Sequence, residues 1–347
     1  GFPFYRNTDF AYYAPCEAGF ETMLEELRKA EKYIFMEYFI IEEGMMFNSI
    51  LSILEDKVKQ GVEVRVMYDD MGSLGTLPAF YAKQLEKKGI KAVSFNRVSH
   101  RKILVIDGKV AFSGGANLAN EYINKKVKYG HWMDNIFCVK GNAVWSYLVM
   151  FLTNWNALRH EDFDYSVFKC TDPIDESQYD GYIVPYAETP LDEELTGQSV
   201  YEDLLNSANE YVYIMTPYLI IDSEMINTLI HTAKKGVDVR IIMPGIADKQ
   251  IVHDIGTTYY AQLIHGGVKI YEYEPGFVHS KVFISDDTYA TVGTINLDYR
   301  SLYLHFENGT LLYKSKKIMD MKQNFFDTLS HCKEIQIEDT HVNIVKG

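Results

Sequence analysis

The sequence lacks the features that mark several common classes of protein. It has four cysteines and no Cys-x-x-Cys pair, so neither a structural zinc site nor a disulfide framework is expected, and a reducing compartment fits best. No apolar run reaches the roughly 18 residues that a membrane-spanning helix needs. No P-loop, Gly-x-Gly-x-x-Gly fingerprint or Gly-x-Ser-x-Gly elbow occurs, which argues against the common nucleotide-binding and serine-hydrolase motifs.

The sequence also has fewer basic than acidic residues. Lysine and arginine number 34 against 48 acidic residues, which gives a formal net charge of −14. Binding to nucleic acid depends on basic side chains that neutralise phosphates, so no nucleic-acid partner is expected. The remaining composition, 47% hydrophobic and 24% charged, is typical of a globular protein with a large core. A chain of 347 residues is long enough for two domains.

What the sequence does contain is an internal repeat. Residues 61–67 (GVEVRVM) parallel residues 236–242 (GVDVRII), and each follows a helical pattern that ends in basic residues and a glycine. Matched segments are displaced by 175 to 179 residues, which indicates one duplication of a half-chain unit. Short β-branched and aromatic runs alternate with amphipathic helices within each unit, so the sequence predicts an α/β fold.

The junction between the two units is expected in a polar stretch. Residues 159–181 are rich in aspartate and contain Pro173. We therefore expect a first domain at 1–165, an acidic linker at 166–181 and a second domain at 182–347. An acidic surface loop inside a single domain is the alternative, and it is weaker because the repeat boundary falls at the same place.

One pattern of residue types occurs at matching places in both units. It reads His-x-Lys, four residues, Asp, six residues, Gly, two residues, Asn, and all five positions are displaced by 179. A lone His-x-Lys strand is most often a partly buried histidine beside a surface lysine, but two in-phase copies favour a functional site. The members are His100, Lys102, Asp107, Gly114 and Asn117 in the first unit, and His279, Lys281, Asp286, Gly293 and Asn296 in the second.

Strand geometry predicts what each residue type can do. Residues two apart share a face of a strand, so the histidine and lysine of each motif project together. The aspartates have the opposite parity and stand at hairpin turns, so we expect them to hold the hairpins, with a minor electrostatic role. Gly114 and Gly293 lack a Cβ and would let the backbone approach a ligand closely. Asn117 and Asn296 would add neutral donors.

Together the two units would supply two imidazoles, two ammonium groups and two amides, a set that suits a phosphodiester. The lysines and asparagines would hold the non-bridging oxygens. One histidine would attack phosphorus while the other protonates the departing alkoxide. Because the ammonium groups supply the charge that a metal would otherwise bring, neither a metal nor an organic cofactor is expected.

The doubled motif resembles the hallmark of the phospholipase D superfamily, and the chain is most similar within it to the bacterial cardiolipin synthases. The likeness covers nearly the whole chain and includes residues 190–194 (PLDEE), 293–301 (GTINLDYRS) and 304–309 (LHFENG). It implies two similar phospholipase D-like α/β/α halves, related by a pseudo-twofold axis, with the active site at their interface.

The resemblance also implies roles for individual residues. His100 would be the nucleophile that forms a phosphohistidine, and His279 would be the general acid. In this superfamily a carboxylate downstream of each motif orients the imidazole. Glu307 matches that position after His279, and Asp134 is the best match after His100, although these synthases usually carry Arg where Met133 stands.

The implied activity is that of a phosphatidyltransferase that joins two phosphatidylglycerols into cardiolipin and releases glycerol. The alternative is a hydrolytic relative, a phospholipase D or a phosphodiesterase or nuclease, in which water resolves the phosphohistidine. The acidic composition weighs against a nuclease. A catalytically inactive scaffold is a third possibility, and the two intact motifs argue against it.

The implied partners are phosphatidylglycerol, anionic membrane lipid and the membrane surface, at the bacterial cell membrane with the catalytic part facing the cytoplasm. Cardiolipin synthases usually begin with two membrane-spanning helices, so the present chain is expected to be a soluble portion that lacks them. They also usually have a longer loop before the first motif than residues 94–99. Met45, Met46 and Phe47 are candidates for lipid contact, with core packing as the alternative.

Overall fold

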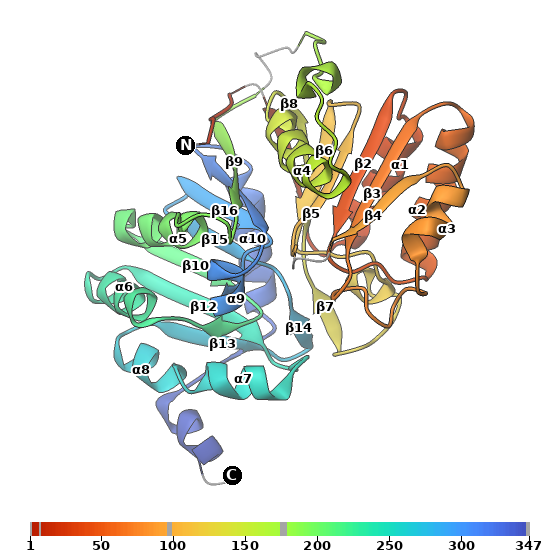
Figure 1. Ribbon diagram of the computed structural model, residues 1–347. Helices are drawn as coiled ribbons and strands as arrows, with labels where there is room; N and C mark the ends of the chain where they lie inside the picture. The colour runs from red at the N-terminus through yellow and green to blue at the C-terminus, as the bar shows by residue number, and fades with distance from the viewer. Residues whose placement is uncertain (1, 7, 96–98, 174–178, 345–347) are drawn as a thin grey trace.

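The computed structural model consists of two α/β units that lie side by side, each built on one large sheet (Figure 1). It describes residues 2–6, 8–95, 99–173 and 179–344. Residues 174–178, in the expected linker, and residues 96–98, in the segment before the first motif, lie outside the described residues. The prediction of an α/β fold with two similar halves is confirmed. The domain boundaries at 165 and 182 stay a prediction.

The first sheet has seven strands in the order β1-β8-β6-β5-β2-β3-β4. Strands β2, β3 and β4 are parallel to one another, and the other strands continue the sheet in an antiparallel manner. Parallel neighbours need crossover connections, which here are helices. The strands are β1 (Thr8–Tyr13), β2 (Tyr33–Tyr38), β3 (Glu63–Asp69), β4 (Lys91–Phe95), β5 (Lys102–Ile106), β6 (Val110–Gly114) and β8 (Ile136–Gly141).

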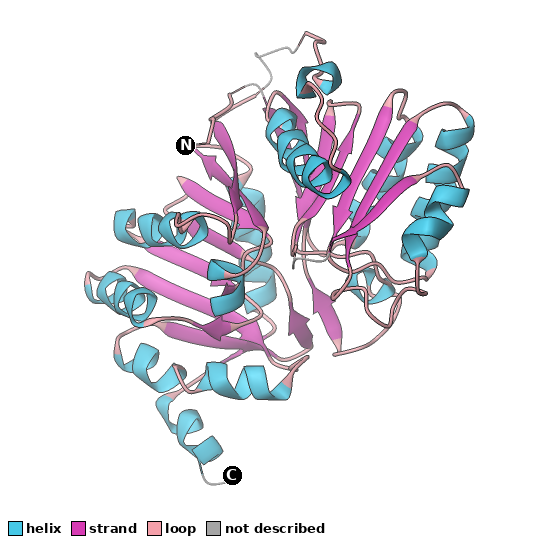
Figure 2. Cartoon of the chain, viewed as in Figure 1, coloured by secondary structure: helices cyan, strands magenta, loops and turns pink. Residues whose placement is uncertain are grey.

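Helices cover both faces of the first sheet (Figure 2). Helices α1 (Glu17–Arg28), α2 (Met45–Lys59) and α3 (Tyr81–Lys87) bury their apolar faces in one hydrophobic cluster. Helix α4 (Val144–Arg159) is apolar almost all round and packs in a different cluster on the opposite face. Such a helix is expected to be buried on several sides.

The second sheet has eight strands in the order β19-β13-β12-β10-β15-β16-β18-β9. Helices α5 (Thr196–Ser207), α6 (Ser223–Lys234) and α8 (Tyr260–His265) share one apolar cluster, while α10 (Ile318–Leu329) packs in the cluster that contains α4. The strands are β9 (Tyr182–Glu188), β10 (Tyr211–Met215), β12 (Asp238–Pro244), β13 (Lys269–Tyr273), β15 (Val282–Ser285), β16 (Tyr289–Gly293), β18 (Glu307–Tyr313) and β19 (Cys332–Glu334).

Several short elements complete the described chain. They are η1 (Asn120–Ile123), β7 (His131–Met133), η2 (Tyr165–Phe168), β11 (Leu219–Ile220), α7 (Gln250–Thr257), β14 (Gly276–Val278), β17 (Leu297–Asp298), α9 (Tyr299–Tyr303) and η4 (Ile337–Ile344). Strand β7 of the first half pairs in parallel with β14 of the second half, and both lie at the seam in Figure 1.

The sequence repeat corresponds to the same corner in both halves. Residues 61–67 and 236–242 form the turn after a helix and the strand that follows it, β3 or β12. Gly61 has φ 86° and Gly236 has φ 94°, a left-handed conformation that glycine adopts without steric cost. The two sheets also match in the antiparallel order β2-β5-β6-β8 and β10-β15-β16-β18.

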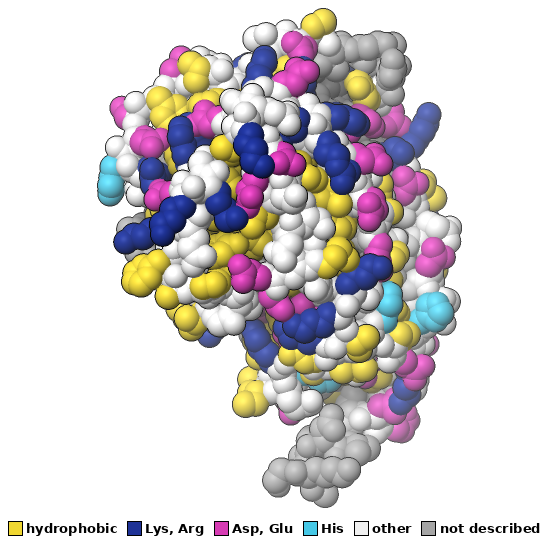
Figure 3. All heavy atoms as spheres, turned by 90° about the vertical axis from the view of Figure 1, so that its right-hand side faces the viewer, with side chains coloured by type: hydrophobic (Ala, Val, Ile, Leu, Met, Phe, Trp, Pro, Cys, Tyr) yellow, Lys and Arg dark blue, Asp and Glu magenta, His cyan; other side chains and the backbone are white. Residues whose placement is uncertain are grey.

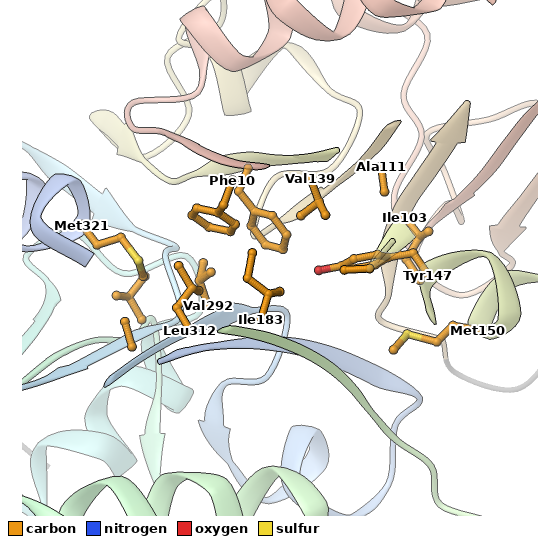
Figure 4. Packing of buried hydrophobic residues seen from close by; sticks show 14 of the residues in the cluster. Phe10, Ile103, Ala111, Val139, Tyr147, Met150, Ile183, Val292, Leu312 and Met321 are labelled. Atoms are coloured by element: carbon orange, nitrogen blue, oxygen red, sulfur yellow. The ribbon is translucent and has the colours of Figure 1, made fainter. Parts of the chain in front are cut away.

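The two halves share one hydrophobic core. Helices α4 and α10 and the inner faces of both sheets contribute to a single cluster of buried side chains (Figure 4). The hydroxyl groups of Tyr147 in α4 and Thr310 in β18 are hydrogen-bonded across the seam. Members from the first half include Phe10, Ile103, Ala111, Val139 and Met150, and members from the second include Ile183, Val292, Leu312 and Met321.

The suggestion that residues 45–47 contact lipid is wrong for two of the three. Met46 and Phe47 are fully buried because they form the inward face of the first turn of α2, while Met45 is 42% exposed. Among the helices in the described part of the chain, none combines the length and the hydropathy needed to cross a bilayer.

Candidate active site

Both motif histidines lie at the same edge of their sheets. Tyr38 at the end of β2 stands opposite Lys102, and Met215 at the end of β10 stands opposite Val282. His100 lies two residues before Lys102 and His279 lies three residues before Val282, so each lies where the parallel strands have their carboxyl ends. In open α/β sheets this is the edge at which ligands bind.

The backbones of the two motifs are joined across the seam. The His100 N–H donates to the carbonyl of Phe306 at 2.9 Å, and the His279 N–H donates to the carbonyl of Met133 at 2.7 Å. The second contact continues the parallel pairing of β14 with β7. Each histidine is therefore anchored, through its own backbone, to the half that does not contain it.

The carboxylates are exchanged between the halves. The His100 Nδ1 atom lies 3.0 Å from both carboxylate oxygens of Glu307, and the His279 Nδ1 atom lies 2.7 Å from Asp134 Oδ2. All four side chains are buried. The order of residues along the chain suggests that each histidine pairs with the carboxylate of its own half. The structure differs because Glu307 and Asp134 directly follow the segments that pair across the seam.

The hydrogen bonds fix the tautomer of both imidazoles. Each carboxylate accepts a hydrogen bond from Nδ1–H, so the neutral ring keeps the lone pair on Nε2, which is available for chemistry. Burial lowers the pKa of His100 to about 3, with Glu307 opposing and Lys102 adding to the shift. Burial lowers the pKa of His279 to about 4, with Lys281 adding and Asp134 opposing. Both rings are therefore neutral near pH 7 in the free protein.

The motif lysines lie against their own histidines. Lys102 Nζ donates to the His100 carbonyl at 2.6 Å, and Lys281 Nζ donates to the His279 carbonyl. Both side chains are only 1% exposed. Burial lowers the pKa of Lys281 to about 8 and that of Lys102 well below its usual range. Each ammonium group keeps two further N–H donors for an anion.

The motif aspartates lie at the opposite ends of their strands, away from the histidines. The Asp107 carboxylate accepts the backbone N–H groups of residues 31, 32 and 33 at 2.8 Å. The Asp286 carboxylate accepts those of residues 209, 210 and 211 at 2.7 to 3.0 Å. Each aspartate thus ties its hairpin to the start of the neighbouring strand, which is the position that strand parity predicts.

The motif glycines provide close approach between strands. A Cβ on Gly114 would lie 2.5 Å from the Asn135 carbonyl, and a Cβ on Gly293 would lie 2.3 Å from the Asn308 carbonyl. The backbone of the neighbouring chain approaches these glycines, at Asn135 just before β8 and at Asn308 in β18, and a phosphate-binding role for the two glycines stays a prediction.

The motif asparagines differ between the halves. Asn117 is hydrogen-bonded at both amide atoms, since Oδ1 accepts the Ile40 N–H at 3.0 Å and Nδ2 donates one hydrogen to the Tyr122 hydroxyl at 2.8 Å. Asn296 is 4% exposed, and its Oδ1 has no hydrogen-bond partner among the described residues. Of the two, Asn296 is thus the one whose amide is left for a ligand.

The sequence analysis missed the rings that lie beside the histidines. Trp132, two residues before Asp134, has its ring centroid 5.5 Å from that of His279. His305, two residues before Glu307, is 5.9 Å from His100 in the same way. Comparing the residues that precede the two carboxylates would have found this pair, because their positions in the repeat are equivalent.

One set of side chains has a spacing that could hold a metal ion. Ligand atoms of His100, His305 and Glu307 lie within 4.8 Å of one another. However, the His100 Nδ1 atom and Glu307 are already paired with each other, and the pKa of His100 is influenced by two neighbouring ammonium groups, Lys102 and Lys281. Such a charge distribution favours an anion over a cation.

The chain matches a known protein family in both halves. A family model described as "Cardiolipin synthase, PLD-like domain" matches residues 23–139 and 201–329, one segment in each half. The chain belongs to this phospholipase D family. The expected recognition, and the expectation that the chain is an enzyme of the phosphatidyltransferase type, are confirmed at the level of the family.

Relatives in this family include named synthases. The chain is 51% identical to an uncharacterized protein of Streptococcus mutans, with 96% of the chain and 75% of that protein covered. It is 35% identical to cardiolipin synthase 2 of Bacillus anthracis, with 93% and 65% covered, and 32% identical to the cardiolipin synthase of Clostridium perfringens, with 96% and 73% covered. The chain thus spans about two thirds to three quarters of the length of these relatives.

Solved structures agree on the fold. The crystal structure of phosphatidylserine synthase from Haemophilus influenzae Rd KW20 superposes with a TM-score of 0.72 at 18% identity, covering 96% of this chain and 89% of that chain. Polyphosphate kinase from Porphyromonas gingivalis gives a TM-score of 0.65 at 13% identity, covering 95% and 49%. At these identities the likeness concerns the fold alone.

Proposed function

We propose that the chain is a phosphatidyltransferase that joins two phosphatidylglycerols into cardiolipin and releases glycerol. The observation that carries the proposal is the pair of buried imidazoles, each held at Nδ1 by a carboxylate, with Lys102 and Lys281 beside them. Relatives named cardiolipin synthase support the choice of substrate. The site of action would be the bacterial cell membrane, with the catalytic part facing the cytoplasm.

In the first step, His100 Nε2 attacks the phosphorus of one phosphatidylglycerol. A nitrogen–phosphorus bond forms and the bond from phosphorus to the glycerol oxygen breaks. That oxygen leaves with the electron pair and takes a proton from His279 Nε2. A bound phosphodiester anion raises the proton affinity of a neighbouring imidazole, which explains how His279 can be charged in the complex although it is neutral in the free protein.

In the second step, a hydroxyl group of another phosphatidylglycerol attacks the phosphohistidine. His279, now neutral, accepts the proton of that hydroxyl. The new oxygen–phosphorus bond forms as the nitrogen–phosphorus bond breaks, which restores His100 and gives cardiolipin. Glu307 and Asp134 would hold the two imidazoles in line through both steps.

The lysines would hold and neutralise the phosphoryl oxygens. Each retains N–H donors that are not used by its own backbone contact, and a buried ammonium acts strongly on an anion because little water screens it. The Asn296 amide would add a neutral donor. With this charge supplied by the chain itself, the proposed reaction needs no metal or organic cofactor.

The proposal is tested by incubating the protein with phosphatidylglycerol vesicles and identifying the lipid products by mass spectrometry. We expect cardiolipin and glycerol in equal amounts, and no turnover in the His100→Ala variant. Phosphatidic acid as the sole product would mean that water resolves the intermediate and the protein is a hydrolase. Cleavage of DNA with no change in the lipid would identify a nuclease.

A further inference from the structure

Exposed apolar side chains gather on the loop that follows β3, at the edge of the first sheet where His100 lies. Met71 is 67% exposed, and Leu74 and Phe80 are each 76% exposed. A single exposed apolar residue is common on protein surfaces, but three within ten residues form an apolar surface that is typical of a binding interface. Figure 3 views this half from outside and shows hydrophobic side chains among lysines and acids.

The second half repeats this feature at the equivalent place. The loop after β12 carries Ile246, which is 41% exposed, and leads into α7 with Ile251, which is 76% exposed. Ile246 is displaced from Met71 by 175 residues, the same displacement that relates residues 61–67 to 236–242. One exposed apolar position therefore matches between the halves, and the equivalent loop in each half carries further exposed apolar side chains.

Both loops lie close to the catalytic histidines. The backbone at Gly72 packs so closely on Phe39 that a Cβ there would lie 2.3 Å from the Phe39 carbonyl, and the Phe39 ring is 4.9 Å from that of His100. In the second half, the Ile246 N–H donates to the carbonyl of Gly276, in the strand that leads directly to His279.

A third exposed apolar site at the same edge lies among lysine side chains. Val127 is 83% exposed and stands between Lys126 and Lys128, in the segment that joins η1 to β7. These two lysines pair with Glu42 and Glu121. Lys125 is exposed as well and forms no ion pair with any residue that the structure describes. The edge thus offers apolar groups together with a cationic one.

We propose that this edge docks on the surface of an anionic phospholipid bilayer. The apolar side chains would enter the headgroup region, and Lys125 would contact anionic headgroups. This inference rests on the proposed function, because it brings the site mouth to the layer that holds a lipid substrate. The docking rim consists of Met71, Leu74, Phe80, Val127, Ile246 and Ile251.

The test is flotation of the protein with vesicles made of equal parts phosphatidylglycerol and phosphatidylcholine. We expect Leu74→Ser, Phe80→Ser and Ile251→Ser each to weaken binding by roughly tenfold, since each removes one apolar side chain from the interface. Val167→Ser is the matched control, because Val167 is 71% exposed but lies in η2, near the start of β2 at the far edge of the sheet. Binding to pure phosphatidylcholine should be weaker.

Two outcomes would overturn the proposal. One is vesicle binding by the rim variants that equals that of the wild type and the control. The other is a change from dimer to monomer in the rim variants by sedimentation, which would identify a second copy of the chain as the partner. A parallel assay on short-chain phosphatidylglycerol dispersed without vesicles tests the chemistry alone, so failure of the proposed function is distinguishable from failure of docking.

Discussion

At the residue scale, the decisive contact is the exchange of carboxylates between halves. The two imidazoles are chemically alike, but each is hydrogen-bonded to a different carboxylate. Their proposed roles can therefore be tested separately. Glu307 supports the ring proposed as nucleophile, and Asp134 supports the ring proposed as acid. Changes in the two carboxylates should therefore affect different steps of the same reaction.

We expect Glu307→Gln to slow formation of the phosphoenzyme, by roughly 100- to 10,000-fold, because His100 loses the carboxylate that stabilises its charged form. Asp134→Asn should cause a similar loss with phosphatidylglycerol but little loss with a phosphatidyl ester of p-nitrophenol, a leaving group that needs no acid. Rapid-quench kinetics with both substrates measures the two effects. The opposite pattern would mean that each carboxylate serves the histidine of its own half.

The lysines predict the pH dependence of substrate binding. Lys281, with a pKa of about 8, carries its charge below that pH and loses it as the pH rises through that value. The hold on phosphate then weakens, so kcat/KM, which already declines because neutral His279 must take up a proton, should show an additional alkaline fall above about pH 8. Bound phosphate stabilises the charged form, so the corresponding fall in kcat should occur at higher pH.

Lys281→Arg provides the control for this pH dependence, because a guanidinium keeps its charge throughout the range. Its pH profile should lack the additional alkaline fall, even if the overall rate is lower. Profiles of the two proteins that coincide above pH 8 would remove Lys281 as the cause.

The residue types at the site could be read from the sequence, but their partners could not. The spacing of His100 and Lys102, repeated at His279 and Lys281, was enough to predict phosphodiester chemistry at this site. Which carboxylate meets which histidine depends on how the halves face each other, and chain distance carries no information on that. His305 lies outside the His-x-Lys motif, and only its place before Glu307, equivalent to that of Trp132 before Asp134, pointed to it.

At the element scale, the motif aspartates act as supports for hairpins. Asp107 adopts φ 53° and Asp286 adopts φ 52°, so each stands in a turn while its carboxylate accepts three backbone N–H groups. Hydrogen bonds to a charged acceptor are stronger than neutral ones. The aspartates therefore connect the strand that follows each motif histidine to the beginning of its neighbour.

We expect Asp107→Ala to lower the free energy of unfolding by about 3 kcal/mol, because three buried or half-buried donors lose their acceptor. Asp164→Ala is a suitable control, since Asp164 caps only the exposed η2 and its loss should destabilise the protein much less. Denaturant unfolding at pH 7 measures both. Equal small effects in the two variants would contradict the proposed support.

Strand parity allowed the place of these aspartates to be predicted, since it depends only on alternation along one strand. The role of Gly114 and Gly293 could not be predicted in the same way. What approaches a glycine depends on the strand that pairs beside it, and Asn135 and Asn308 come from elements farther along the chain.

At the scale of the whole molecule, the halves are held together by a common core and by the site itself. Helices α4 and α10 bury their side chains in one cluster with both sheets. Arg101, buried at the seam, donates to the carbonyls of Glu307 and Glu188 in the second half. Neither half can separate without exposing this core and unpairing these groups.

We therefore expect the chain to unfold in a single cooperative transition. Calorimetric and van't Hoff enthalpies should agree, and far-ultraviolet circular dichroism and tryptophan fluorescence should give the same midpoint. Two resolved transitions, or midpoints that differ between the probes, would mean that the halves are independent domains.

The repeat allowed two similar halves to be predicted, because a displacement of 175 to 179 residues is visible in the sequence alone. Which faces of the two halves pack against each other could not be predicted from the repeat. The amphipathic pattern of α2 marks an apolar face, but Met46 and Phe47 could equally have met lipid or core. Only the packed structure distinguishes the two.

A single unit of this fold could not build either histidine–carboxylate pair by itself, because the carboxylate that it carries meets the histidine of another unit. An ancestor with one motif would have needed to form a homodimer, in which both histidine–carboxylate pairs would have been identical. Duplication into one chain frees each copy to change separately. Trp132 beside one histidine and His305 beside the other are differences of this kind, and they would let two equivalent histidines act separately as the proposed nucleophile and the proposed acid.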